Sequence, residues 1–485
     1  MNRPTGRRRA LAGLGALVFA LALVEVTSGI LQGYYTPILT DLARHVGVHD
    51  ADVNWLEAAQ LMVSGLSVPV LAKMGDLWGH KKILLLATAV TAVASWAVAF
   101  APSFPVLLAA WGLQGAYAVW LPLEVAIIYL AATRAGSPDA PADTRRAAGL
   151  LVFALEAGVI AGALSGGAVV EVLPFTATLA IPAVAVTLCL VAITALVPPL
   201  PPTASGRLDV AGIAWLTASL VVLMAGLSLV RIAGITSPWT WLALLGAFAL
   251  LVPFVRHELR VDEPLVDIRM LVAPAQWPVQ VTAALFGVSV LGAQVPLSTF
   301  ARTDPDAVGY GLGLSAGTVS LIIGAYVLSM AVGALLLPVV SRLLSPRGAL
   351  VLASCFVAVG YLLFLPFHAT LAQTLTNMVV AGLGSGLLVA ALPAAAAAAA
   401  PAERTGMASG LTNATKTVGG SIASAVFGVA LFSGVTEAAV EAGQTAAPLS
   451  GYLVVWTVCG VTAAICAVVL ALVVPKGAFT TPARG

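Results

Sequence analysis

The sequence predicts an all-α, polytopic membrane protein, and three observations support this class. Of the 485 residues, 60% are hydrophobic and only 9% are charged, whereas soluble domains average about 25% charged residues. The mean hydropathy is +1.02. The apolar residues gather into runs of the length, about 20 residues, that an α-helix needs to cross a bilayer. No run shows the ten-residue alternation of a transmembrane β-barrel.

Fourteen runs of this kind are expected to form transmembrane helices, because an α-helix satisfies its own backbone hydrogen bonds where water is absent. The first run follows three arginines and resembles a signal peptide. It continues past the small residues that mimic a cleavage site, so we predict an uncleaved first span. The expected spans cover approximately residues 10–33, 53–72, 82–101, 104–132, 147–170, 175–197, 209–231, 238–256, 277–300, 316–341, 347–367, 370–396, 405–432 and 449–474.

The basic residues predict the orientation of these spans. With the N-terminus inside, nineteen of the 23 lysines and arginines fall in inside segments and Lys416 falls within a span. Only Arg44, Arg302 and, at a boundary, Arg231 fall outside. This imbalance is a strong positive-inside signal. We therefore predict a multi-pass protein of the cytoplasmic membrane with both termini in the cytoplasm.

Two connections divide the chain into parts. Segment 198–207 is proline-rich, and segment 256–270 is charged. Two six-helix halves are expected of transporters built from internal repeats, and a short basic loop follows the second span of each half. We predict an N-terminal six-helix bundle over residues 1–200, a two-helix insert over 201–260 and a C-terminal six-helix bundle over 261–485.

The loop after the second span carries a recurring pattern of acid, glycine and basic residues. Asp76 is able to cap a helix N-terminus and to accept from a basic partner, while Gly79 permits a tight turn. With Lys81 and Lys82, this spacing resembles the signature loop of the major facilitator superfamily. The resemblance implies the major facilitator fold, two six-helix bundles plus here two inserted helices, and a conformational role for these four residues.

Glycines in the fifth span carry a second resemblance. Gly158, Gly162, Gly166 and Gly167 are similar to the glycine-rich antiporter motif of drug:proton exporters. Close helix packing through small residues is an alternative that holds in either case. The segment 263–269 and the start of the thirteenth span resemble the fourteen-helix branch of these exporters, the latter through Arg404, Gly406, Ala408, Ser409, Gly410, Asn413, Lys416, Gly419 and Gly420.

The sequence departs from the family pattern at several positions, among them Ala72 in place of the first glycine of the signature loop and Glu25-Val26-Thr27 in the first span. Leu77 replaces a basic residue of the signature loop, and Ala163 replaces a proline of the glycine motif. Trp111 stands where the fourth span of the family carries an arginine associated with proton coupling. If proton coupling exists, another group must carry it.

Acidic residues within the spans are therefore the candidates for proton coupling: Glu25, Glu124, Glu57 and Glu156. A charge near the bilayer centre costs at least about 2.5 kcal/mol, so each needs a structural or functional reason. Glu25 and Glu124 are the first choices. The alternatives are a structural hydrogen bond for Glu25, a fixed salt bridge for Glu124 and snorkelling to the outer interface for Glu57.

The same acids suggest where a substrate binds. Tyr117 and Trp120 share a helical face with Glu124, a combination that suits a lipophilic cation. The expected substrate-cavity residues are Glu124, Tyr117, Trp120, Trp111, Gln114, Gln32 and Gln60. An ion pair between Lys416 and Glu156 or Glu124 would offset the cost of burial and could gate alternating access, with Asn413 nearby. A purely structural pair is equally compatible with the sequence.

The sequence contains little that indicates metal binding, nucleotide binding or hydrolytic catalysis. No HExxH, P-loop or nucleophile-elbow pattern occurs, and we expect a solvated loop around His45 and His49 rather than a metal site. We predict a secondary transporter and not an enzyme, with no cofactor or metal. Its expected partners are the lipid bilayer, an amphiphilic small-molecule substrate and protons, with no nucleic acid, and it is expected to be a monomer.

Proton-coupled efflux of drugs or natural products is the preferred function. The alternative is an importer or facilitator of a small metabolite without proton antiport. The sequence does not name the substrate.

Overall fold

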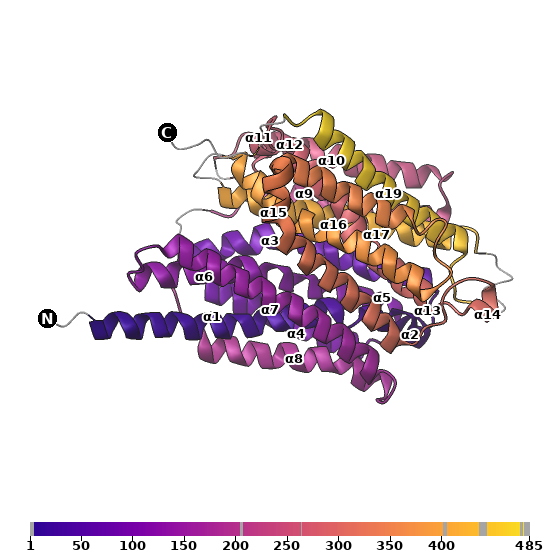
Figure 1. The fold of residues 1–485 in the computed structure, drawn as a ribbon, viewed down its shortest axis with the longest axis horizontal. Helices are drawn as coiled ribbons and strands as arrows, with labels where there is room; N and C mark the ends of the chain where they lie inside the picture. Colours follow the sequence, from indigo (N-terminus) through magenta and orange to yellow (C-terminus); the bar gives the residue numbers. More distant parts are fainter. Residues whose placement is uncertain are drawn as a thin grey trace. The chain divides into compact units, whose positions relative to one another are not determined.

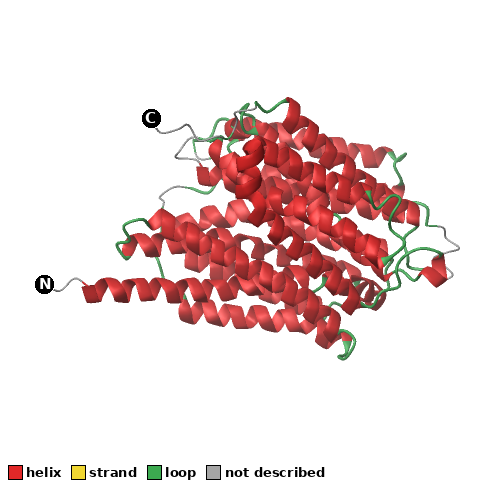
Figure 2. Cartoon of the chain, in the orientation of Figure 1, coloured by secondary structure: helices red, strands yellow, loops and turns green. Residues whose placement is uncertain are grey.

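The computed structural model describes residues 4–203, 207–262, 264–400, 405–435, 444–475 and 479. Within these ranges the chain forms helices joined by loops, without a β-strand (Figure 2). The predicted all-α class is confirmed. Two residues of the family resemblance, Glu263 and Arg404, lie outside the described ranges.

Thirteen helices of the described ranges are long and apolar enough to cross a membrane. The longest of them, α15 (Ala316–Leu362), has 47 residues and would extend about 70 Å, more than twice the hydrocarbon thickness of about 30 Å. Its backbone is non-helical at Ser345, where φ is +73°, immediately before Pro346. α15 therefore comprises two successive spans, which agrees with the fourteen spans that the sequence predicts.

The helices group into two compact units. Unit 1 comprises Met1–Ile38 and Leu66–Leu208, and unit 2 comprises Leu39–Gly65 and Asp209–Gly485. Unit 1 contains α1 (Pro4–Gly33), η1 (Thr36–Ile38), the second part of α3 (Val53–Trp78), α4 (His80–Ala99), α5 (Phe104–Gln114), η3 (Gly115–Val119), α6 (Trp120–Arg134), α7 (Ala140–Val169) and α8 (Phe175–Leu196).

Unit 2 begins with the short helices α2 (Leu39–Val46) and η2 (Asp50–Asp52) and the first part of α3. The inserted helices also belong to it, so the contact-based units differ from the three predicted domains, which stay a prediction. Its remaining helices are α9 (Val210–Ala233), α10 (Pro238–Glu258), α11 (Ile268–Leu271), α12 (Trp277–Val290), α13 (Gln294–Arg302), α14 (Pro305–Val308), α15, α16 (Leu371–Ala398), α17 (Thr405–Phe432) and α19 (Leu449–Leu472).

Several helices begin where a polar side chain can satisfy the first backbone N–H groups. The Asp139 carboxylate accepts from the Ala142 N–H at the start of α7, at 2.9 Å. At the start of α16, Thr370 and Gln373 form a reciprocal capping box. Such caps contribute about 0.5–2 kcal/mol each. α16 (Leu371–Ala398) begins within one residue of the predicted edge, whereas α7 begins at Ala140, seven residues before the predicted span 147–170.

Glycines determine how α1 and α7 pack side by side in unit 1 (Figure 1). A Cβ atom at Gly29 would lie 2.1 Å from the Leu155 carbonyl oxygen, and one at Gly166 would lie 2.1 Å from the Tyr34 carbonyl oxygen. Backbone carbonyls cannot move aside without separating the helices. The packing alternative for the predicted glycine motif is therefore confirmed.

Unit 2 contains an equivalent seam between α12 and α17. A Cβ atom at Gly287 would lie 2.0 Å from the Lys416 carbonyl oxygen, and one at Gly419 would lie 2.0 Å from the Ala284 carbonyl oxygen. α1 and α7 are the first and fifth spans of the first six, while α12 and α17 are the first and fifth of the last six. Corresponding helices of the two halves thus pack through the same kind of backbone contact.

The basic loops after the second helix of each half also correspond. The Lys81 ammonium donates to the Thr194 carbonyl in the last turn of α8, at 3.0 Å. The Arg347 guanidinium donates to the Leu470 carbonyl in the last turn of α19, at 3.0 Å, and to the Ala471 carbonyl. A cation at a helix C-terminus interacts favourably with the unsatisfied carbonyls. The basic loop that recurs after the second span of each half thus makes the same kind of contact in both halves.

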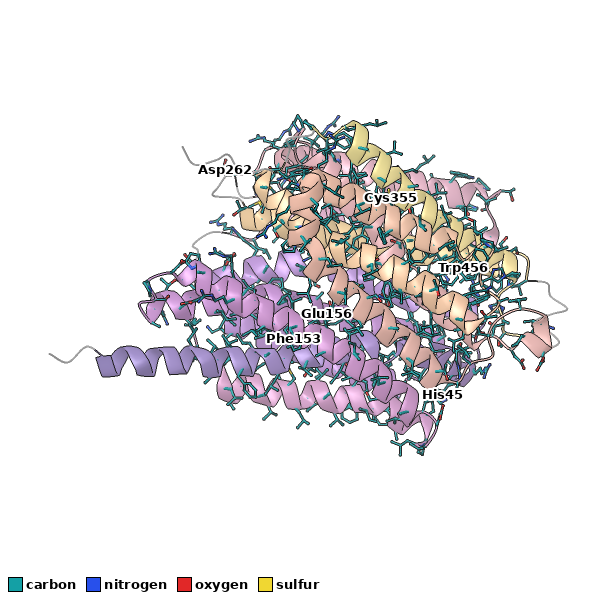
Figure 3. All side chains as sticks on the ribbon, in the orientation of Figure 1. His45, Phe153, Glu156, Asp262, Cys355 and Trp456 are labelled. Carbon is teal, nitrogen blue, oxygen red and sulfur yellow. The ribbon has the colours of Figure 1, made fainter. Side chains whose placement is uncertain are left out.

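The outward-facing surface of the spans is mostly apolar, as expected of a surface in contact with lipid hydrocarbon. Large apolar side chains point outward on most spans, as with Phe153 on α7, which is 73% exposed (Figure 3).

Inside unit 2, aromatic rings form the core. Trp456 stacks on Phe364 with ring centroids 4.8 Å apart, and Phe300 meets Trp456 edge to face at 4.9 Å. Such aromatic pairs contribute about 0.5–1.5 kcal/mol beyond their buried area.

Candidate functional site

Unit 1 brings together the two acids that the sequence favours most. Glu25 on α1 is 1% exposed and Glu124 on α6 is 0% exposed, and their carboxyl groups lie close enough to interact directly. None of the four carboxyl oxygens has another hydrogen-bond partner within the described residues. The described residues give Glu124 no basic partner, so the fixed salt bridge is not found there, while the hydrogen-bond alternative for Glu25 stays open because its carboxyl group interacts with that of Glu124.

Electrostatics limit the charge that this carboxyl pair can hold. Two unit charges about 4 Å apart repel by about 4 kcal/mol even at an effective dielectric constant of about 20. Burial adds the cost of removing each carboxylate from water. The arrangement is therefore suited to hold one proton between two carboxylates, as carboxylate pairs at functional sites do.

The fourth span is interrupted beside the pair. α5 ends at Gln114, the 3₁₀ turn η3 follows, and α6 begins at Trp120, one turn before Glu124. A 3₁₀ stretch inside a long helix often marks a functional hinge or local strain. Any bending of the fourth span at this turn would displace Glu124, which lies in the first turns of α6.

A polar and aromatic group surrounds this turn. The Gln114 side-chain amide donates to the Ser95 hydroxyl at 3.0 Å and to the Tyr35 hydroxyl at 3.5 Å. The Tyr35 ring packs on Trp111 with centroids 4.6 Å apart. The indole N–H groups of Trp111 and Trp120 are buried without a partner in the described part of the chain. Buried polar atoms without partners are unusual in folded proteins and need an explanation.

Most of the predicted substrate-cavity residues are closed off from solvent in this structure. Trp111, Gln114, Trp120 and Glu124 are buried, whereas Tyr117 is half-buried and meets Trp120 edge to face. Outside this group, Gln32 on α1 is exposed and Gln60 on α3 is buried. Their proposed contact with substrate stays a prediction.

The other predicted charged candidates are divided between the units. Glu156 lies half-buried on α7 in unit 1 (Figure 3). Glu57 on α3, and Asn413 and Lys416 on α17, belong to unit 2. An ion pair of Lys416 with Glu156 or Glu124 would join the two units, so it stays a prediction, as does snorkelling of Glu57.

The signature loop is arranged differently from the sequence expectation. Asp76 lies within the last turns of α3 and does not cap α4, so that part of the prediction is wrong. Its carboxylate instead contacts His80 Nε2 at 3.1 Å and accepts from the Thr203 hydroxyl at 3.2 Å. The tight turn is confirmed at Gly79, where φ is +104°. The basic partner is His80 because α3 continues to Trp78, which places Asp76 and His80 about one turn apart.

One segment was not anticipated from the sequence. The solvated loop expected around His45 and His49 is helical at residues 39–46, which form α2 with Leu42 and Ala43 fully buried, although His45 itself is exposed. Leucine, alanine and valine recur there at helical spacing, a signal that is too short to suggest a span. His49 packs edge to face on Phe432 at 5.5 Å. Burial, followed by the charge of Arg231, lowers the pKa of His49 to about 4.

Two ion pairs connect this segment to later helices of unit 2. Asp41 accepts two hydrogen bonds from Arg302 Nη2, at 2.7 and 2.9 Å. Asp52 pairs with Arg231 at 2.6 Å, and the Arg231 guanidinium carbon lies 4.5 Å from the centre of the Phe432 ring. Two of the three basic residues that the positive-inside pattern leaves outside therefore have acidic partners. The sequence feature that could have indicated these ion pairs is the presence of two acids, Asp41 and Asp52, in the same outer segment.

We expect Arg302→Ala to lower the free energy of unfolding by about 1–3 kcal/mol, because it leaves the partly buried Asp41 without its partner. Asp41→Ala is expected to cost a similar amount, and the double variant less than the sum. Thermal unfolding of the purified protein in detergent measures these values. Arg44→Ala, at an exposed position of α2, is the control and is expected to change stability by less than about 0.5 kcal/mol. Strictly additive losses would contradict a direct pair.

The fold and the buried acids together define a class of protein. Two sets of six spans, joined by an insert and packed through corresponding seams, are the organisation of a secondary transporter built from repeats. The family model described as Major Facilitator Superfamily matches residues 21–424 and 279–484. The chain belongs to this superfamily and is a multi-pass membrane transporter.

Individual proteins similar to this chain include exporters. The tetracenomycin C resistance and export protein of Streptomyces glaucescens is 27% identical over 445 residues, which cover 89% of this chain and 78% of that protein. The multidrug resistance protein Stp of Mycobacterium tuberculosis is 25% identical over 411 residues, which cover 81% and 71%. The crystal structure of an auto-inhibited POT family peptide transporter aligns over 97% of this chain and 98% of its own, with a TM-score of 0.66 and 14% identity. At that identity the last similarity shows the fold alone.

Proposed function

We propose that this transporter is a proton-coupled exporter of amphiphilic drugs or natural products, working by alternating access in the cytoplasmic membrane with both termini in the cytoplasm. The observation that carries the proposal is the buried pair of Glu25 and Glu124, which no described basic residue neutralises through a hydrogen bond. Relatives named as drug resistance and antibiotic export proteins support the direction of transport.

In the proposed cycle, the pair alternates between holding a proton and being doubly charged. Deprotonation toward the cytoplasm leaves two adjacent carboxylates, a state whose repulsion favours rearrangement of α1 against α6. Bending at η3 moves Glu124 during this change. Binding of substrate then favours one conformation of the transporter, and protonation from the outside favours the other. An inward proton is therefore exchanged for an outward substrate.

The remaining assignments follow from this cycle. Glu57 and Glu156 are secondary candidates for the proton path. The contacts of Asp76 with His80 and Thr203, the turn at Gly79 and the contact of Lys81 with the end of α8 form, together with Lys82, a conformational latch. The proposed partners are the bilayer, the amphiphilic substrate and protons, the proposed working unit is a monomer, and no nucleic acid takes part.

The function is tested by measuring accumulation of toxic fluorescent compounds in cells with and without the protein. We expect the protein to lower accumulation and to protect growth, and an uncoupler to remove both effects. Glu171→Gln is the matched control, since Glu171 is exposed beyond the end of α7 and its removal is expected to leave export unchanged. Export that persists fully in the presence of an uncoupler would contradict proton coupling. Protection that is absent for every compound would contradict export.

A further inference from the structure

The inserted hairpin of α9 and α10 is largely exposed, and polar contacts hold its ends. The two helices pack side by side (Figure 1). Only four residues of each are buried, namely Gly212, Ser219, Gly226 and Leu227 in α9 and Thr240, Ala247, Phe254 and Glu258 in α10. At one end of the hairpin, Arg231 pairs with Asp52 at 2.6 Å.

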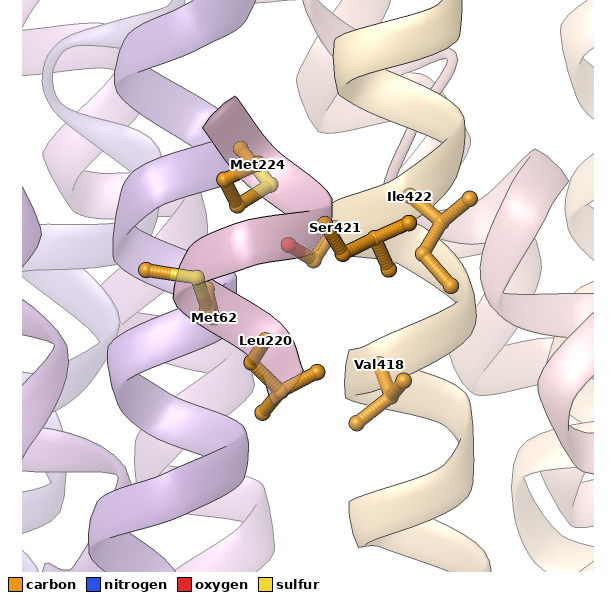
Figure 4. A pocket seen from close by; sticks show the side chains of 7 residues that line it. Met62, Leu220, Met224, Val418, Ser421 and Ile422 are labelled. Atoms are coloured by element: carbon orange, nitrogen blue, oxygen red, sulfur yellow. The ribbon is translucent and has the colours of Figure 1, made fainter. Parts of the chain in front are cut away.

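The middle of α9 meets other helices of unit 2 through apolar side chains. The residues that line the space between α3, α9 and α17 include Met62, Leu220, Met224, Val418, Ser421 and Ile422 (Figure 4). The Ser421 hydroxyl donates to the Ala58 carbonyl at 2.7 Å and so makes no polar contact to α9. The charged groups that fix the hairpin are therefore found at its ends.

Two carboxyl groups meet at the end of the hairpin that lies opposite Arg231. Asp209 precedes α9, and Glu258, which is 3% exposed, ends α10. A Cβ atom at Gly212 would lie 2.4 Å from Asp209 Oδ2 and 2.3 Å from Glu258 Oε1. Both oxygens therefore occupy the space that the absent side chain leaves, and the two groups are close enough to interact directly.

The other oxygen of each carboxyl group already has partners. Asp209 Oδ1 accepts from the Gly212 N–H at 2.9 Å and lies 2.7 Å from His257 Nε2, while Glu258 Oε2 accepts from the Val266 N–H at 2.9 Å. Asp209 Oδ2 and Glu258 Oε1 are buried without a donor in the described part of the chain. One proton between these two oxygens satisfies both of them, because a protonated carboxyl group donates one hydrogen bond.

Glu258 is the acid that holds this proton. Asp209 accepts from the N-terminus of α9 and contacts His257, and both contacts favour an ionised carboxylate. His257 interacts with both acids, whereas the Arg269 guanidinium donates to the Leu259 carbonyl at 2.8 Å. The other basic side chains near these positions in the chain, Arg207, Arg256 and Arg260, are exposed.

The carboxyl pair connects three parts of unit 2, namely the start of α9, the end of α10 and the linker of residues 264–267 that leads to α11. Val266 lies in this linker, and the next residue, Asp267, caps α11 by accepting from the Met270 N–H at 3.0 Å. Loss of the shared proton leaves two adjacent carboxylates, which repel each other. Movement of Glu258 relieves this repulsion and breaks its contact with Val266.

We propose that Asp209 and Glu258 share one proton that is exchanged with the cytoplasm, and that loss of this proton releases the linker from the hairpin. This end of the insert is then a sensor of cytoplasmic pH. At lower pH the Glu258 hydroxyl donates to Asp209 Oδ2 and the linker is held. As the pH rises, the proton leaves to water, both groups become carboxylates and the linker detaches. The cytoplasmic location follows the proposed orientation, whereas the sensor itself is independent of the direction and coupling of transport.

The test is hydrogen–deuterium exchange of the purified full-length protein in lipid nanodiscs, followed by mass spectrometry of peptides that contain Val266. Exchange is measured between about pH 5 and about pH 9, a range that covers buried carboxyl groups with perturbed titration. Each rate is divided by that of an unfolded reference peptide at the same pH. We expect protection of the linker to fall by about tenfold or more as the pH rises, because opening is linked to release of a proton.

Two variants test whether the shared proton is the cause. Glu258→Gln has the shape of protonated glutamate, and its amide donates to Asp209 at every pH, so we expect it to keep the high protection throughout. Gly212→Ala places a methyl group in the space of the two oxygens and is expected to lower protection at every pH. Asp262→Asn, at an exposed position before the linker (Figure 3), is the control and is expected to retain the wild-type pH profile.

Protection that stays constant with pH in the wild type, or that falls equally in Glu258→Gln, would overturn the proposal. A pH profile that is lost in Asp262→Asn as well would assign the effect to general charge rather than to the pair, and would also overturn it. The measurement needs no transported substrate. Its outcome is therefore separate from that of the export experiments.

Discussion

Glu124→Gln is expected to abolish uphill, proton-driven transport, with a loss of at least about 100-fold in rate. Glutamine matches the shape of a protonated glutamate but cannot release a proton, so one state of the cycle becomes permanent. The neutral side chain also removes the repulsion from Glu25. We therefore expect the folded protein to be as stable as the wild type or more stable, which distinguishes a lost function from a lost fold.

Glu124→Gln is expected to affect uphill, proton-driven transport and substrate exchange differently. Exchange of labelled for unlabelled substrate across the membrane needs no net proton movement, so Glu124→Gln is expected to retain it. Glu25→Gln is expected to behave in the same way, and the double variant to be no worse than either single one, because the two groups act as a unit. Vesicle uptake with and without a pH gradient measures both activities. Uphill transport by Glu124→Gln at the wild-type rate would exclude Glu124 as an essential proton carrier.

The second large effect is expected at the seam between α1 and α7. In Gly166→Ala, the added methyl group would lie 2.1 Å from the Tyr34 carbonyl oxygen, and this clash is with backbone rather than with a flexible side chain. Overpacking costs about 1–3 kcal/mol where neighbours can relax, and we expect a loss at or above the top of that range here. The protein is expected to unfold at a clearly lower temperature and to be recovered in lower yield.

Gly149 on the same helix supplies the matched control, because a Cβ atom there meets nothing within 4 Å. Gly149→Ala is expected to be neutral or to stabilise the protein by up to about 1 kcal/mol, owing to the higher helix propensity of alanine. Both variants are compared by thermal unfolding in detergent. Equal unfolding temperatures for Gly166→Ala and Gly149→Ala would show that the helices are not held in backbone contact.

The spans were predictable because hydropathy and length are local properties of the chain. The expected ranges 175–197 and 405–432 lie within one residue of α8 and α17 at each end, and the break at Ser345 falls between the predicted spans 316–341 and 347–367. The glycine seam could also be anticipated, since small residues at helical spacing have few other uses in a membrane.

The features that could not be predicted from the sequence depend on contacts between residues far apart in the chain. Asp41 and Arg302 are 261 positions apart, and nothing local marks them as partners. Glu25 and Glu124 could be singled out by the cost of burying a charge, but the sequence does not show that each is the neighbour of the other. The cap expected at Asp76 failed because the end of α3 was placed several residues too early.

The central claim is that transport is coupled to protons through the pair of Glu25 and Glu124. The most direct measurement adds a transported substrate to proteoliposomes of the purified protein, with no imposed gradient, and follows proton movement with a pH-sensitive dye. The proposed mechanism predicts proton flux opposite to substrate flux at a fixed ratio, present in Glu171→Gln and absent in Glu124→Gln. Substrate flux without proton movement in the wild type, or unchanged proton movement in Glu124→Gln, would contradict it.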